Sequence, residues 1–384
     1  MDKLVMIPGP TPVARSIQDQ MGREIQAFGD PRFVADYKEV IAALGRLLNC
    51  SGKTFVIPGT GTLAMEMALA NITRAGDPVL IISHGYFGDR FVEICQRKGL
   101  DCDVLTCEWG EIVPLDRIEA QLAAKPYAVV TVTHVDTSTG VCAPLEAIGE
   151  LMQGYPDTLL IVDGVCATGA EREDFDQMGI DILFTGTQKA FGVCPGMLML
   201  WASEKALQKR LALGSIPEYY VDFQNWMPIM ADPGKYFSTP AINLVWALKE
   251  SLRLIDQQGL EARYAWHQKN AAAVHQAMTA LGFSILANPG YRAVTLSNLI
   301  YPEGMADQDF RARLYIEGVV VAGGLGPYAG RLFRLGHMGH ITSDHMVRAI
   351  AAIERTMAYF GKLPQPGMAL GTYLSAMMAP SRVA

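Results

Sequence analysis

The sequence predicts an α/β fold, with a large domain built on a mainly parallel central sheet and a smaller α+β domain on its C-terminal side. Two observations indicate the large domain: short apolar runs recur along the first half of the chain, and segments with a helical pattern lie between most of them. Strands that alternate with helices form mostly parallel sheets. A change of pattern after residue 240 indicates the second domain.

The apolar runs are the expected strands of the large domain, since continuous apolar runs are typical of strands that are buried on both faces. They cover residues 54–59, 78–83, 128–135, 159–163, 181–186 and 196–202. Helices are expected between them, for instance over residues 62–76 and 87–99. Ligands bind at the carboxyl ends of the strands in such sheets, so the residues that follow each strand are the first candidates for a functional site.

The second half of the chain begins with two expected long helices, over residues 241–259 and 260–282, each of which ends at a glycine. Further segments, including 292–302 and 331–339, precede a last expected helix over residues 343–361. We therefore expect the chain to have three parts. They are an N-terminal arm (1–20), a large domain that contains the sheet (21–258) and a small C-terminal domain (259–384).

The composition excludes several classes of protein. The formal net charge is −7 and the basic residues form no run, which argues against nucleic acid as the main partner. No stretch of 18 apolar residues predicts a membrane span, and the first residues lack the apolar region of a secretory signal. The seven cysteines match no CxxC spacing, so we expect reduced thiols and a cytoplasmic location.

The segment FTGTQKAFGVCPG, residues 184–196, places Lys189 in a turn after an expected strand. Small, polar and glycine residues surround this lysine. One interpretation is an ordinary surface lysine in a loop. The other is an amine that is held in a pocket, where it can form a Schiff base. The segment alone does not decide between them.

A second expected strand end is followed by PGTGTLAMEMAL, residues 58–69. Thr60, Gly61 and Thr62 lie where the strand ends and a helix begins. The first amides of a helix have no partners inside it, and the helix dipole is positive there, so this turn suits a phosphate group. It is not a Walker A loop, since no GK[ST] follows. The alternative is an ordinary helix N-cap.

Asp163 stands at the end of the run LLIVD. A carboxylate at the end of a buried strand is costly unless a cation meets it, and a protonated ring nitrogen could serve as that cation. A helix N-cap or a structural ion pair is an equally good explanation. Asp163 and Lys189 are separated by one crossover and one strand, so both should face the same edge of the sheet.

Three further segments carry candidates. Thr137 follows a strand in THVDTSTGV, Phe87 follows another in SHGYFGDRF, and Arg334 has apolar neighbours in RLFRLGHMG. Thr137 suits either a capped turn or a ligand contact. Phe87 suits either the core or a position where its ring stacks on a flat ligand. Arg334 suits either the surface or a site where it binds a carboxylate through two hydrogen bonds. The histidines within 337–345 lack a known spacing of metal ligands, so no metal is expected.

Taken together, these features specify one cofactor. A lysine amine, an aspartate at a strand end, a helix start that suits phosphate, an aromatic ring and an arginine for a carboxylate are what pyridoxal 5′-phosphate (PLP) requires. The sequence also resembles the class V aminotransferases of PLP fold type I, in particular the alanine–glyoxylate and serine–glyoxylate group. The resemblance covers nearly the whole chain, from PGPTPV through the segments quoted above to KYFSTP and FRLGHMG.

The resemblance implies roles for individual residues. Lys189 would form the Schiff base with PLP, and Asp163 would pair with the pyridine N–H. Both would be catalytic. The other implied cofactor contacts are Thr60, Gly61, Thr62 and Gln188 at the phosphate, Phe87 and Val165 on the two ring faces, and Thr137 near the 3′-oxygen. Arg334 would bind the substrate carboxylate. Tyr236 and Thr239 would reach the phosphate of the partner subunit, which implies a homodimer with shared active sites.

The expected reaction is transfer of an amino group from a small amino acid, alanine or serine, to glyoxylate or pyruvate. One departure bears on the donor: AFGDPRF, residues 27–33, is closer to ureidoglycine–glyoxylate and pyridoxamine–pyruvate aminotransferases. A second departure, Cys166 where Ser or Thr is common, is expected to tune the site without abolishing its activity. Ureidoglycine, pyridoxamine and an aminophosphonate therefore remain alternative donors. A cysteine desulfurase or another lyase is disfavoured, because a desulfurase needs a cysteine well after the lysine and none follows Cys194.

Overall fold

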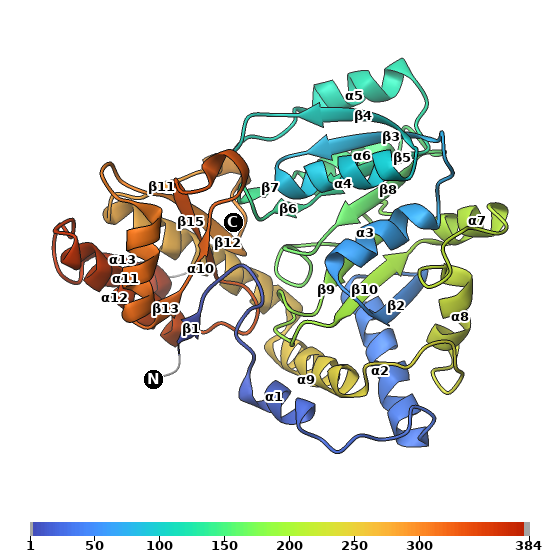
Figure 1. Ribbon diagram of the computed structural model, residues 1–384, viewed down its shortest axis with the longest axis horizontal. Helices are drawn as coiled ribbons and strands as arrows, with labels where there is room; N and C mark the ends of the chain where they lie inside the picture. Colours follow the sequence, from blue (N-terminus) through green and yellow to red (C-terminus); the bar gives the residue numbers. More distant parts are fainter. Residues whose placement is uncertain (1–2, 380–384) are drawn as a thin grey trace.

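The computed structural model describes residues 3–379 and contains the predicted α/β architecture (Figure 1). Its main sheet has the strand order β2-β10-β9-β8-β5-β3-β4. β10 runs antiparallel to both of its neighbours, and the other neighbouring pairs are parallel. The strands are β2 (Lys53–Pro58), β3 (Pro78–Ser83), β4 (Asp101–Thr106), β5 (Val129–Thr133), β8 (Leu159–Asp163), β9 (Ile182–Gly186) and β10 (Met197–Ala202).

The apolar runs predicted this sheet correctly except for one of its two edge strands, β4. β5, β8, β9 and β10 are buried along their whole length, as continuous apolar runs require. β4 lies at the edge beside β3, and only one of its residues, Leu105, is buried. Because an edge strand carries polar side chains such as Asp101 and Asp103, it has no apolar run to identify it.

Helices cover the faces of the main sheet (Figure 1). Together with the strands they bury a large hydrophobic cluster whose members extend from Ile17 to Ile255. These helices are α1 (Arg15–Met21), α2 (Pro31–Leu47), α3 (Gly61–Ala70), α4 (Tyr86–Arg97), α5 (Leu115–Ala124), α6 (Leu145–Met152), α7 (Glu204–Ala212), α8 (Phe223–Ala231) and α9 (Ile242–Gln258).

A second, antiparallel sheet has the order β11-β12-β15-β14 and lies beside the main sheet, at the left of Figure 1. A second hydrophobic cluster fills this part. The predicted last helix is not the last, because α13 follows it. The elements are α10 (Leu260–Ala280), β11 (Ser284–Ile285), β12 (Leu296–Ile300), α11 (Asp307–Ile316), β13 (Val319–Val320), β14 (Ala322–Gly323), β15 (Leu332–Gly336), α12 (Ser343–Tyr359) and α13 (Met368–Met378).

The N-terminal segment joins the two parts of the fold. β1 (Leu4–Val5) pairs in parallel with β13, and Met6 belongs to the second hydrophobic cluster, whereas Ile17 of α1 belongs to the first. The residues between β1 and α1 cross the main sheet at the carboxyl ends of β8 and β9. Within residues 3–379, no helix is both long and apolar enough to cross a bilayer. The division of the chain at residue 258 stays a prediction.

Candidate active site

A cavity of about 180 Å³ lies at the carboxyl ends of β8 and β9. Eight of the residues that line it are predicted site residues, and the others are Met65, Arg90, Val135 and Cys166. The eight are Thr60, Gly61, Thr62, Phe87, Asp163, Val165, Gln188 and Lys189. A larger cavity, of about 620 Å³, lies between α2 and α9, and no predicted site residue lines it.

Lys189 points into this cavity and does not lie on an exposed loop. Its Nζ donates a hydrogen bond to the carbonyl oxygen of Pro8 at 2.6 Å, and Thr11 Oγ1 donates to the carbonyl oxygen of Lys189 at 2.9 Å. Gly9 has a φ of +129°, and a Cβ at this position would lie 2.5–2.6 Å from the side-chain atoms of Lys189. Only glycine fits there, so the N-terminal segment forms a close cover over the lysine.

Asp163 is 3% exposed, and Oδ1 of its carboxylate accepts a hydrogen bond from the amide of Val165 at 2.9 Å. No lysine, arginine or histidine of residues 3–379 forms an ion pair with it, so the structural ion pair that the sequence left open is absent from the described chain. Burial raises the pKa of Asp163 to about 7, and the nearby carboxylate of Asp136 adds to this rise. A cationic ligand would relieve that cost.

The start of α3 forms one end of the cavity. Thr60 is the N-cap, and its Oγ1 accepts from the amide of Leu63 at 3.5 Å. A Cβ on Gly61 would lie 2.8 Å from Cγ2 of Val165, so the two residues pack closely. Gln188 Oε1 is buried and has no hydrogen-bond partner among the described residues. Free helix amides suit a phosphate, and Gln188, whose side chain also carries an NH2 donor, lines the same cavity.

Arg90 is a cavity residue that the sequence analysis missed. Its Nη1 donates to Thr62 Oγ1 at 2.9 Å, and its guanidinium lies 4.6 Å from the centre of the Phe87 ring. It therefore adds a positive charge at the end of the cavity formed by the start of α3. Its position three residues after Phe87 on α4 was a usable signal, because such pairs share one face of a helix.

Phe87 is positioned by Asp136, a second residue that the sequence analysis missed. The buried carboxylate of Asp136 accepts the amide of Phe87 at 2.8 Å and that of Gly88 at 3.3 Å, at the start of α4. Asp136 also accepts from the hydroxyl of Ser138 at 2.6 Å. The carboxylate thus anchors the segment that presents the Phe87 ring to the cavity.

Arg334 and Thr137 lie together beside the cavity without lining it. Nη1 of Arg334 donates to Thr137 Oγ1 at 3.0 Å, and Nε donates to the carbonyl oxygen of Gly323 at 2.8 Å. Within residues 3–379, Nη2 makes no hydrogen bond. Burial raises the pKa of the Cys166 thiol, and the charges of Lys189 and Arg334 partly offset this rise. The positive charge of Arg334 is therefore close enough to act on Cys166, which lines the cavity.

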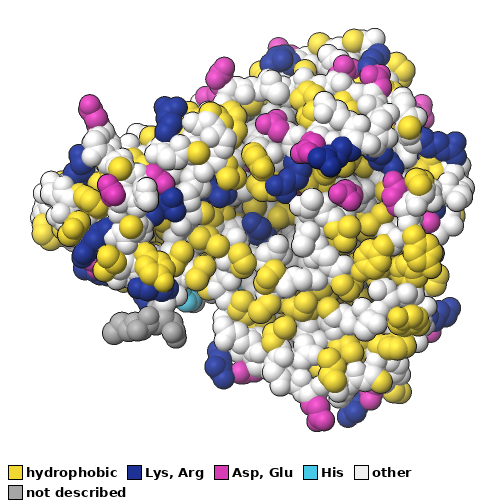
Figure 2. Space-filling model, in the orientation of Figure 1, with side chains coloured by type: hydrophobic (Ala, Val, Ile, Leu, Met, Phe, Trp, Pro, Cys, Tyr) yellow, Lys and Arg dark blue, Asp and Glu magenta, His cyan; other side chains and the backbone are white. Residues whose placement is uncertain are grey.

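Tyr236 and Thr239 do not line this cavity. Thr239 is exposed, and the ring of Tyr236, which is 64% exposed, packs against Phe28 with the ring centres 5.3 Å apart. Tyr236 belongs with Tyr219 and Tyr220 to a set of exposed large side chains. We call these three tyrosines the aromatic surface. Figure 2 shows hydrophobic side chains gathered over α8 and the chain beside it.

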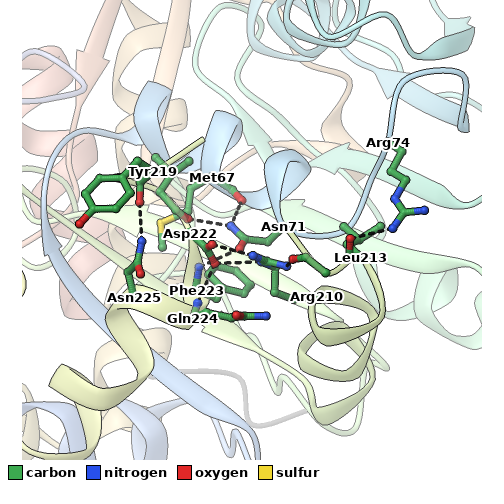
Figure 3. A network of polar contacts seen from close by, with 12 residues as sticks. Met67, Asn71, Arg74, Arg210, Leu213, Tyr219, Asp222, Phe223, Gln224 and Asn225 are labelled. Carbon is green, nitrogen blue, oxygen red and sulfur yellow. Dashed lines mark hydrogen bonds and ion pairs between the residues drawn. The ribbon is translucent and has the colours of Figure 1, made fainter. Parts of the chain in front are cut away.

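A polar network holds the chain that carries Tyr219 and Tyr220 (Figure 3). The buried guanidinium of Arg210 forms two hydrogen bonds with the carboxylate of Asp222, of 2.9 and 2.6 Å. Asn71, the C-cap of α3, accepts from the amide of Phe223 at 2.8 Å. Because these groups are buried and paired, residues 219–223 are fixed to α3 and α7.

The residues of the cavity fit PLP. The amides at the start of α3 and the NH2 group of Gln188 would donate to its phosphate. The buried carboxylate of Asp163, which forms no ion pair among the described residues, fits its pyridine N–H, and Lys189 supplies an amine for its aldehyde. The structure therefore brings these predicted residues together, and Phe87 and Val165 line the same cavity. Tyr236 and Thr239 remain outside.

The chain is similar to known proteins along most of its length. The family model described as aminotransferase class-V matches residues 19–350. An uncharacterised aminotransferase of Methanocaldococcus jannaschii is 33% identical, over 94% of each chain. The L-aspartate–glyoxylate aminotransferase of Paracoccus denitrificans is 32% identical, over 93% of this chain and 91% of that one. A protein named soluble hydrogenase, small subunit, of a Synechococcus species is 31% identical, over 93% and 94%.

Two solved structures are also similar to this chain. The ureidoglycine–glyoxylate aminotransferase of Bacillus subtilis has a TM-score of 0.93 at 27% identity, over 98% of each chain. An alanine–glyoxylate aminotransferase of a Nostoc species has a TM-score of 0.89 at 32% identity, over 93% of this chain and 96% of that one.

Proposed function

Since the chain belongs to the class V aminotransferases, we propose that it transfers an amino group from alanine or serine to glyoxylate or pyruvate, with PLP in the cavity at the ends of β8 and β9. The observation that carries this proposal is that Lys189 and Asp163 line one cavity. An amine and a buried carboxylate without a counter-ion suit the two ends of one pyridine ring.

PLP would supply the aldehyde that takes up the amino group and the ring that accepts electrons from the substrate. Asp163 would hold a proton at the ring nitrogen, and a pKa raised to about 7 suits a carboxyl that needs a cationic partner. Lys189 Nζ would remove the proton from the donor's Cα, acting as a general base and then as an acid. Phe87 and Val165 would bind the two faces of the ring.

Arg334 would bind the α-carboxylate that donor and acceptor share. Its Nε and Nη1 are already held by Gly323 and Thr137, so the guanidinium plane is fixed before substrate arrives. A fixed guanidinium suits a carboxylate because both are planar and can form two parallel hydrogen bonds. Pro8 and Gly9, which cover Lys189, would help to keep water from the reacting amine.

The relatives support glyoxylate as the acceptor, since the names of the Paracoccus, Bacillus and Nostoc proteins all contain it. Their donors differ: aspartate, ureidoglycine and alanine. The segment AFGDPRF favours ureidoglycine as a second candidate donor, as does the likeness to the Bacillus structure. Pyridoxamine and an aminophosphonate remain further alternatives.

The protein is proposed to act as a homodimer in which Tyr236 and Thr239 complete the phosphate site of the partner subunit. Both residues are exposed and lie outside the chain's own cavity, as a role across an interface requires. The aromatic surface supports this proposal, because tyrosines are enriched at protein interfaces.

A screen of donors and acceptors on the PLP-loaded protein tests the proposal. Alanine, serine, aspartate, ureidoglycine and pyridoxamine would each be offered with glyoxylate and with pyruvate, and the carbonyl product of each donor (a keto compound, or the aldehyde pyridoxal from pyridoxamine) would be measured. Alanine or serine with glyoxylate is expected to give the highest kcat/KM. A higher value for ureidoglycine or aspartate would reassign the donor and leave the reaction class intact. The absence of keto product with every donor would refute the proposal.

A further inference from the structure

Arg263 of α10 connects the two backbone segments that carry the proposed catalytic residues. Its side chain is buried, at 1% exposure. Nε donates to the carbonyl oxygen of Gly169 at 2.7 Å, and Nη2 donates to that of Ala190 at 2.5 Å. Gly169 lies in the loop that follows Asp163, and Ala190 directly follows Lys189. One guanidinium therefore bridges both segments.

The charge of Arg263 has no acidic partner. No carboxylate of residues 3–379 forms an ion pair with it, and its remaining bond runs from Nη1 to the amide oxygen of Gln258 at 3.1 Å. Burial lowers its pKa to about 10, so the guanidinium is still charged at neutral pH. A buried cation with only neutral acceptors is costly, and an apolar side chain would fill the same space without that cost. The hydrogen bonds are therefore what Arg263 contributes.

Three successive carbonyls of the lysine turn accept bonds from side chains of distant segments. Thr11 binds the carbonyl of Lys189, Arg263 that of Ala190, and Ser251 of α9 that of Phe191. Of these three side chains, Arg263 is the one that also binds the loop after Asp163.

The two segments are otherwise joined by packing. In the described part of the chain, no direct backbone hydrogen bond connects residues 165–171 to residues 187–193. They meet where Gly169 packs on Phe191, since a Cβ on Gly169 would lie 3.4 Å from that ring. The pairing of β8 with β9, and the bonds from Gly164 N to Phe184 O and from Thr185 Oγ1 to Val165 O, set the separation where the strands end. Beyond that point, Arg263 is the side chain among the described residues that hydrogen-bonds to both segments.

We infer that Arg263 is a positioning residue that sets Lys189 relative to Asp163. This inference rests on the proposed function, because it assumes that both residues engage one cofactor. The amine of Lys189 and the carboxylate of Asp163 would contact opposite ends of one rigid ring. If either segment shifted, the ring could not make both contacts at their best geometry. A misplacement of about 1 Å can reduce a rate by roughly 100-fold.

The test compares Arg263→Gln and Arg263→Lys with the wild type, and uses Ser251→Ala as the matched control. Hydrogen exchange of the apoprotein would be followed in peptides that cover residues 164–171 and 187–193. Arg263→Gln is expected to raise exchange in both segments, whereas Ser251→Ala should raise it only in the second. A lysine cannot reproduce the spacing of two guanidinium nitrogens, so Arg263→Lys should still raise exchange in at least one of them.

PLP affinity and steady-state kinetics give the second readout. Arg263→Gln should raise the Kd for PLP about tenfold or more and lower kcat by roughly 10- to 100-fold. Its KM for glyoxylate should stay within about threefold of the wild-type value, because Arg334 is untouched. Arg263→Lys should show a smaller change in the same direction.

Two failures can be distinguished. If wild-type protein binds PLP and turns over, and Arg263→Gln does the same with unchanged exchange in both segments, the inference is wrong and the proposed function stands. If Arg263→Gln does not fold, Arg263→Lys decides, and an unchanged Kd with unchanged exchange contradicts the inference. If wild-type protein binds no PLP, the proposed function itself fails.

Discussion

The guanidinium of Arg334 donates a hydrogen bond to the hydroxyl of Thr137, with 3.0 Å between Nη1 and Oγ1. The two residues come from different parts of the protein. Thr137 lies in the turn after β6 (Val135–Asp136), which follows β5 of the main sheet, and Arg334 lies in β15 of the second sheet. Their contact joins the two parts of the fold beside the cavity. It also fixes the orientation in which the guanidinium would meet a substrate carboxylate.

Arg334→Lys is expected to lose affinity for donor and acceptor alike, because both carry an α-carboxylate. Truncating a buried charged contact costs roughly 2–5 kcal/mol, which corresponds to a loss of about thirtyfold to several thousandfold in kcat/KM. Both half-reactions would be measured by stopped flow. Arg331→Lys, a change at an exposed position in the turn just before β15, is the control and should leave both unchanged. Loss of only one substrate would mean that another residue binds the other.

Lys189→Ala should lower kcat by several orders of magnitude, as expected for a group that acts in more than one step. Borohydride treatment of the PLP-loaded wild type should attach the cofactor to the peptide that contains Lys189, which mass spectrometry would identify. Lys53→Ala removes an exposed lysine and is the control. Attachment of the cofactor to a different lysine would show that the cavity has been misassigned.

Asp163→Asn should change the pH dependence of apoprotein stability. Burial raises the pKa of Asp163 from 3.8 to about 7, so the unfolded chain loses its proton first as the pH rises. Between about pH 4 and pH 7 the folded state binds more protons, and the free energy of unfolding therefore falls with pH. At about 1.36 kcal/mol per pKa unit, the total loss is roughly 4 kcal/mol.

The asparagine variant lacks this cost. Its apoprotein should match the wild type near pH 4 and be more stable at pH 8, as measured by chemical denaturation. Its turnover should collapse even though some PLP still binds, because the ring nitrogen loses the charge that holds its proton. Identical stability profiles for the two proteins would show that Asp163 is not strained by burial.

Mixing two inactive variants tests the shared site. In a dimer of Lys189→Ala with a Tyr236→Phe/Thr239→Ala chain, one of the two sites has every proposed group intact. Random exchange of subunits should therefore restore about a quarter of the wild-type sites. Activity would be measured before and after mixing, with light scattering to establish the oligomeric state. A fully active monomer, or no recovery after subunit exchange, would contradict the proposed arrangement.

The sequence was sufficient for the residues that follow buried strands. Asp163 and Lys189 could be assigned to one edge because β8 and β9 are apolar runs in a parallel arrangement, and the carboxyl ends of such strands meet. The turn at Thr60–Thr62 followed from the same rule. The edge strand β4 was missed because its side chains are largely polar and give no apolar run.

Residues that act through contacts between distant segments could not be predicted in this way. Arg263 lies in a helix, far along the chain from the carbonyls that it binds, and the helical pattern of 260–282 says nothing about that contact. The cover that Pro8 and Gly9 form over Lys189 likewise depends on how the N-terminal segment crosses the sheet. Such contacts join distant segments and are visible only in three dimensions.

The most direct measurement of the central claim is a single turnover of the PLP-loaded protein with alanine in the absence of any acceptor. One pyruvate per active site should be released, and the amino group should remain with the cofactor. Glyoxylate added afterwards should then yield one glycine per site. Protein that takes up no PLP, or that takes it up and releases no keto acid from any amino donor, would contradict the account.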